Sequence, residues 1–117
     1  PALDLIYFLT YLALFVEGVQ VHGVVDVAQA RRVYRLARDP RAELGSVIHR
    51  CLASYVRRLG LGLDVLHPLR LLAWMVYARH EYQTTWQAYG KTPGVPELRQ
   101  SMFLHLWEEE LAGSGGA

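Results

Sequence analysis

Arginine is the residue type whose spacing in this chain points most clearly to a chemical role. Eight of the eleven arginines fall between Asp26 and Gly60, and this segment carries a net charge of +5 in a chain whose total is +1. The guanidinium group is permanently charged, and its paired donors match the oxygens of a phosphate. Such a concentration of arginines favours an extended polyanion as the partner.

The helical repeat places these arginines away from the apolar positions. In the first predicted helix of the segment, Arg31, Arg35 and Arg38 lie within about 60° of one another. We therefore expect the arginines to be displayed rather than packed. The residues predicted to contact nucleic acid are Arg31, Arg32, Arg35, Arg38, Arg41, Arg50, Arg57 and Arg58.

The same arginines are also compatible with simpler roles. Charge on the exposed side of an amphipathic helix is normally only a solvated surface. Ion pairs with a neighbouring subunit, or a genome that uses Arg in place of Lys, would also produce it. Two helices joined by a short turn resemble a helix-turn-helix, but the exposed start of the second helix offers only Arg41, Glu43 and Ser46 to base edges. Sequence-independent contact with a duplex backbone is the better interpretation.

The remaining reactive side chains do not predict catalysis or metal binding. His49 and Cys51 are two residues apart and point to different faces of a helix, and the sequence His80-Glu81 lacks the second histidine of a metalloprotease helix. Cys51 is the single cysteine, which excludes an internal disulfide, and its apolar neighbours predict a small core residue. We expect a non-enzymatic protein with no catalytic residue, metal, cofactor or small-molecule substrate.

The elements that would position the arginines are all helices. Prolines stand at predicted helix starts and glycines just after predicted helix ends, which divides the chain into helices at 2–17, 26–38, 40–59, 64–89 and 96–112. Residues 19–25 form a loop or a short extended connector. We expect an all-α fold, a compact bundle of about five helices in a single domain at 1–117, with the basic helix pair at 26–60 and a Gly-rich tail at 113–117.

Apolar periodicity predicts which faces these helices bury. The predicted buried stripe of helix 40–59 consists of Leu44, Val47, Ile48, Cys51, Leu52, Tyr55 and Leu59. The first half of helix 64–89 is apolar on two sides, including Leu72, Met75 and Val76, and this predicts that it lies at the centre of the bundle.

The N-terminal helix is apolar on all faces, and 52% of the residues in the chain are hydrophobic. A domain of this size has too little interior to bury them all, so we expect a homo-oligomer. The predicted interface residues are Leu5, Phe8, Leu9, Leu12, Phe15 and Val16. This apolar run is too short for a membrane span and lacks the features of a signal peptide. We expect an intracellular location, in the cytoplasm or within a virion, and no membrane partner.

Together these features predict an oligomeric structural protein that binds nucleic-acid backbone, of a coat or nucleoid type. The alternative is a helical protein–protein interaction module that binds an amphipathic partner helix in an apolar groove. The run Glu108–Glu110 ends the last predicted helix, where the helix dipole disfavours acids. It is either a solvated tail or a surface that meets a basic neighbour.

Overall fold

Five α-helices make up most of the described chain. The computed structural model describes residues 1–20, 25–89 and 101–114. The helices are α1 (Ala2–Val16), α2 (Val27–Arg38), α3 (Glu43–Arg58), α4 (Leu66–Tyr89) and α6 (Met102–Ser114), with a 3₁₀ turn at Leu63–Val65. These ranges contain no strand, and the prediction of an all-helical fold is confirmed.

Local sequence explains several helix boundaries. The Asp26 side chain accepts the backbone N–H of Gln29 at 3.1 Å and caps the start of α2. Gly18 and Gly60 have φ angles of +73° and +76°, and each follows the end of a helix in a conformation that glycine adopts without strain. The predicted ends of α1 and α3 are therefore confirmed.

Other boundaries differ from the prediction. α3 begins at Glu43 instead of residue 40, because residues 40–42 form a turn in which the Asp39 side chain accepts the backbone N–H of Arg41. Ser101 is not helical, and α6 runs from Met102 to Ser114. Parts of the predicted connector at 19–25, of the helix at 96–112 and of the tail lie outside the described residues.

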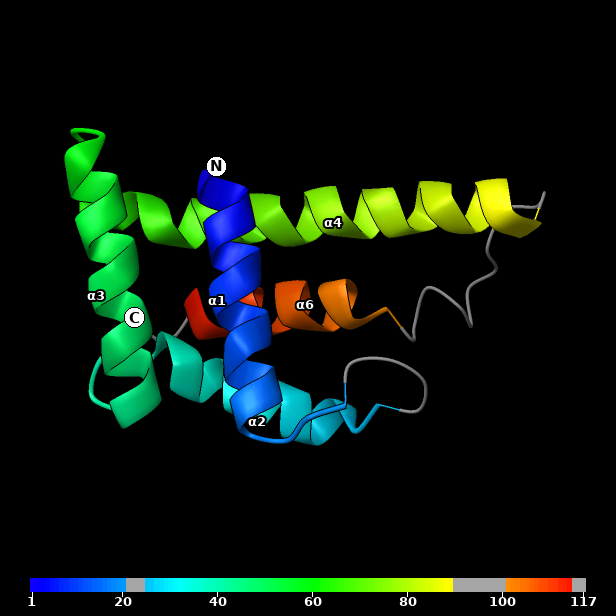
Figure 1. Cartoon of the computed structure of the whole chain (residues 1–117), viewed down its shortest axis with the longest axis horizontal. Helices are drawn as coiled ribbons and strands as arrows, with labels where there is room; N and C mark the ends of the chain where they lie inside the picture. The colour runs from blue at the N-terminus through cyan, green and yellow to red at the C-terminus, as the bar shows by residue number, and fades with distance from the viewer. Residues whose placement is uncertain (21–24, 90–100, 115–117) are drawn as a thin grey trace.

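Three helices lie side by side in one layer, with α6 between α4 and α2 (Figure 1). α1 crosses this layer and contacts both α4 and α2. α3 stands at one end of the layer and runs antiparallel to α1 (Figure 1). The whole body measures 43 × 28 × 26 Å.

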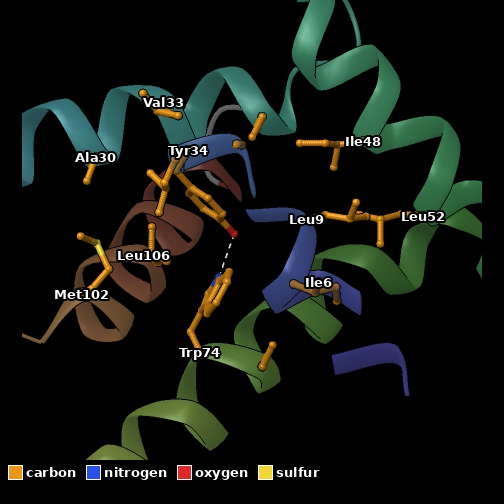
Figure 2. Close-up of a cluster of buried hydrophobic side chains, with 14 of the residues drawn as sticks. Ile6, Leu9, Ala30, Val33, Tyr34, Ile48, Leu52, Trp74, Met102 and Leu106 are labelled. Atoms are coloured by element: carbon orange, nitrogen blue, oxygen red, sulfur yellow. Dashed lines mark hydrogen bonds between the residues drawn. The ribbon is translucent and has the colours of Figure 1, made fainter. Parts of the chain in front are cut away.

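The core lies where α1 crosses the layer. Trp74 of α4 and Tyr34 of α2 are its largest fully buried side chains, and the indole N–H of Trp74 donates to the Tyr34 hydroxyl at 2.9 Å (Figure 2). Stacked rings extend the core between α1, α4 and α6, and they belong to Tyr7, Tyr11, Tyr77 and Phe103. The arginines of α2 thus lie on a helix whose apolar side is buried in the core.

Gly45 allows α3 to start against the end of α2. A Cβ atom at this position would collide with the backbone carbonyl oxygens of Leu36 and Asp39. Only glycine permits such a close approach of two backbones. This contact sets the direction in which α3 leaves the layer.

The buried face of α3 is rotated from the predicted one. Ile48 and Leu52 are buried as predicted, and Val56 joins them. Val47 is 48% exposed, and Cys51 is exposed as well, so the prediction that both belong to the core is wrong. α3 stands at the end of the layer, where neighbours cover only one of its sides.

The prediction that α4 is the centre of the bundle is also wrong. Trp74 and Ala73 are fully buried, but Leu72, Met75 and Val76 are 49%, 55% and 43% exposed. α4 forms the edge of the three-helix layer, and α6 and α1 cover only the side that bears Trp74. The opposite side of α4 remains at the surface.

Candidate functional site

Arginines of α2 face glutamates of α6 across the layer. Arg31 Nε and Arg35 Nη1 each lie 2.9 Å from a carboxylate oxygen of Glu109, whose side chain is 7% exposed. Burial alone would raise the pKa of Glu109, but the hydrogen bonds and charges of Arg35 and Arg31 outweigh it and lower the pKa below its ordinary value. Glu109 is therefore a charged carboxylate that joins two turns of α2 to α6.

Glu110 is the most enclosed carboxylate in this cluster, with a side chain 3% exposed. Its Oε1 accepts the Tyr34 hydroxyl at 2.6 Å and lies 3.3 Å from Arg38 Nη1, while its Oε2 lies 2.6 Å from His67 Nδ1. Burial and the charge of Glu110 raise the pKa of Tyr34 well above its ordinary value, so Tyr34 is a neutral donor. One carboxylate thus links α6 to both α2 and α4.

These contacts change the interpretation of the α2 arginines. Arg31 and Arg38 are only 29% and 15% exposed, so the expectation that they are displayed is wrong. The acidic run at the end of α6 is not a solvated tail, because the basic neighbour it meets is α2 of the same chain. Breaking a buried ion pair such as the one between Arg38 and Glu110 typically costs about 3–5 kcal/mol. The primary role of the ion pairs between α2 and α6 is therefore structural.

The arginines of α3 have a different environment. Arg50, Arg57 and Arg58 are exposed, and none has an acidic partner among the described residues. With His49, Ala53 and Ser54 they line a shallow hollow of about 480 Å³. Arg50 and Arg57 are two turns apart, or about 10.5 Å along the helix. All the lining residues come from α3, and Arg50, Ser54 and Arg58 also border a second hollow that α3 shares with Leu5 of α1.

The last two predicted contact residues lie at the surface. Arg32 is exposed on α2. Arg41 is 92% exposed, and its Nε lies 3.3 Å from Asp39, an arrangement that contributes little to stability in water. The eight predicted arginines therefore separate into three paired with glutamates of α6, one paired with Asp39, and four exposed ones that have no acidic partner among the described residues.

The predicted interface residues of α1 also separate into two groups. Leu9 is 8% exposed and lies in the core of the subunit, with Leu5 packed partly against it. The other four are exposed and share one side of α1, and they are Phe8, Leu12, Phe15 and Val16. Leu5 and Leu9 therefore pack within the subunit, whereas the other four side chains are exposed to solvent.

Sequence reasoning missed the contact between His67 and Glu110, because the two residues are 43 positions apart. Within residues 1–20, 25–89 and 101–114, no three His, Cys, Asp or Glu side chains are grouped so that they could hold a metal ion. The described residues therefore offer a cluster of exposed arginines on α3 and a structural ion-pair cluster at α6.

The comparisons with known proteins add no family to this picture. No protein-family model matches the chain, and neither a curated protein nor a solved structure is significantly similar to it. No single described helix is both long and apolar enough to cross a membrane. α3 and residues 63–84 reach that length and composition only as a pair, with a bend of 112° between them.

Proposed function

We propose that the protein is a non-enzymatic, oligomeric structural protein that binds the phosphate backbone of nucleic acid through α3. The surface that contacts phosphate, which we call the α3 cationic surface, consists of Arg50, Arg57 and Arg58. The observation that carries the proposal is the contrast between two sets of arginines. Arg31, Arg35 and Arg38 of α2 are held by Glu109 and Glu110, whereas the arginines of α3 are exposed and have no acidic partner among the described residues.

The chemistry of the α3 cationic surface suits a repeating phosphate. Each guanidinium can donate two parallel hydrogen bonds to one phosphate group. The α3 cationic surface lies on one straight helix and includes no side chain that would select a base edge by a defined pair of hydrogen bonds. Contact with the backbone, independent of sequence, follows from this composition.

The number of arginines in the α3 cationic surface sets the strength of the expected salt dependence. Three phosphate contacts predict a slope of about −3 when the logarithm of the binding constant is plotted against the logarithm of the salt concentration. Between 50 and 200 mM salt this corresponds to a loss of affinity of about 40-fold. All eight arginines of the sequence prediction would give a slope of about −7.

Fluorescence anisotropy with a labelled random-sequence duplex at several salt concentrations tests the proposal. We expect binding to protein stripped of nucleic acid, with a slope close to −3 for each bound subunit. Two duplexes of unrelated sequence should give the same constants. Failure to bind at low salt would contradict the proposal.

A second candidate is a protein-interaction module, and one observation favours it. A hollow of about 460 Å³ lies between α1 and α3, and it is lined by Leu5, Val47, Arg50, Cys51, Ser54, Tyr55 and Arg58. An apolar groove with a cationic edge suits an amphipathic helix that carries acidic residues. Salt separates the two candidates, because apolar contacts do not weaken as salt rises.

A further inference from the structure

One side of α1 carries large apolar side chains that no other described part of the chain covers. This row, which we call the α1 stripe, consists of Phe8, Leu12, Phe15 and Val16, with exposed fractions of 60%, 45%, 79% and 63%. Their spacing of four, three and one residues places all four side chains on one helical face. A contiguous apolar row of this kind marks an interaction site.

The apolar surface continues from α1 onto the neighbouring helix. Val47 and Cys51 are exposed on the flank of α3 that lines the hollow shared with α1. Stable protein interfaces bury about 1,200–2,000 Å² in total, more than one narrow row of side chains supplies. The α1 stripe and the α3 flank together form a surface two helices wide.

The charges around this surface favour a second copy of the same chain. α1 and α3 run antiparallel (Figure 1), so exposed Glu17 and Glu43 lie at one end of the pair, while Arg58, which lines the α1–α3 hollow, lies at the other. A twofold axis perpendicular to α1 would bring the acidic end of each copy to the basic end of the other. A parallel arrangement would place like charges together.

We propose that two copies of this chain pack through the α1 stripe, with the two α1 helices antiparallel and the twofold axis near Leu12. Phe8 of each copy then lies opposite Val16 of the other, and the Val47 flank completes the contact. The inference specifies the oligomer of the proposed function. Arg50, Ser54 and Arg58 line both the α3 hollow and the α1–α3 groove, whereas His49, Ala53 and Arg57 line the α3 hollow alone. The α3 cationic surface therefore borders the dimer contact, and its Arg57 side remains open to a phosphate.

Sedimentation velocity over a range of protein concentrations, without nucleic acid, tests the interface. We expect wild-type protein to dimerise and Leu12→Glu to raise the dissociation constant by at least about 30-fold, as for a buried hot-spot residue. Leu72→Glu is the matched control, because Leu72 of α4 is exposed to a similar extent, 49% against 45% for Leu12. Circular dichroism should show that both variants fold, since both positions lie at the surface.

Three results would overturn the dimer. They are a wild-type protein that is monomeric at every concentration, equal effects of Leu12→Glu and Leu72→Glu, and a monomer that binds phosphatidylserine vesicles through the α1 stripe. The last result would identify an anionic lipid surface as the occupant. None of these measurements involves nucleic acid. A result that overturns the dimer therefore does not decide whether the protein binds nucleic acid, which the salt titration tests separately.

Disulfide trapping tests the antiparallel direction. In a Cys51→Ser background, Leu12→Cys should form an intermolecular disulfide, because position 12 of each copy lies at the axis. Phe15→Cys should remain unlinked, because its two copies would be about 9 Å apart along the helix direction, beyond disulfide reach. A disulfide formed by Phe15→Cys and not by Leu12→Cys would contradict the proposed packing.

Discussion

Replacing Glu110 with glutamine tests the structural role of the cluster between α2, α4 and α6. The substitution preserves the size of the side chain and keeps an oxygen that can accept the Tyr34 hydroxyl. It removes the negative charge that faces Arg38 at 3.3 Å and His67 at 2.6 Å. Arg38 would then be a cation that is 15% exposed and has lost its closest carboxylate.

The expected cost follows from the burial of the pair. Removing one partner from a buried ion pair costs about 3–5 kcal/mol, because the charge that remains is poorly solvated. Arg38 Nη2 keeps a contact of 3.9 Å with Glu109 Oε1, which places the expected cost near the lower end of this range. The total stability of a domain is about 5–15 kcal/mol, so this is a large fraction. With a urea m-value of about 2 kcal/mol/M, a loss of about 3 kcal/mol lowers the unfolding midpoint by about 1.5 M.

Urea unfolding followed by circular dichroism measures this effect, and Glu108→Gln is the matched control. Glu108 stands two positions before Glu110 in the same acidic run, but its side chain is 55% exposed and lies 3.6 Å from Arg31. An exposed pair contributes under about 1 kcal/mol, so the midpoint of this variant should hardly move. Equal midpoints for the two variants would refute the assignment of Glu110 as a buried structural anion.

Two further substitutions test the packing of α6 and α3. The pKa of Glu109 is lowered in the folded protein, so its contribution to stability is complete above its ordinary value of 4.5 and disappears as pH falls through the lowered pKa. Unfolding free energies between pH 6 and pH 3 should therefore decline less steeply for Glu109→Gln than for wild type, and parallel curves would contradict this. Gly45→Ala should destabilise the protein by about 1–3 kcal/mol in urea, because its Cβ would meet two backbone carbonyls. A stability gain of about 1 kcal/mol, the usual result of this change within a helix, would show that α2 and α3 are not so close.

Local rules predicted the elements of this fold well. Asp26 is a capping residue by type and position, and Gly18 and Gly60 take the positive φ angles that a helix end requires. These features depend on a few neighbouring residues, so a sequence shows them directly. The turn after Asp39 was missed because proline is equally suited to a turn and to the first position of a helix.

The pairing of helices could not be predicted by such rules. Arg35 and Glu109 are 74 positions apart, and periodicity alone does not show that α6 lies against α2. The opposite charges of the basic segment and the acidic run were a usable signal, but the acidic run was interpreted either as a solvated tail or as a surface for a basic neighbour, and the arginines were expected to be displayed. For α3, the apolar pattern is wider than the face that its neighbours cover, so Val47 and Cys51 were predicted to be buried.

The salt dependence of duplex binding by matched arginine variants tests the central claim most directly. Arg50→Ala combined with Arg57→Ala removes two of the three proposed contacts, so the slope should fall from about −3 to about −1. Arg79→Ala removes an exposed arginine of α4 and should leave the slope unchanged. The claim would be contradicted if the double variant kept the wild-type slope, or if Arg79→Ala changed it as much.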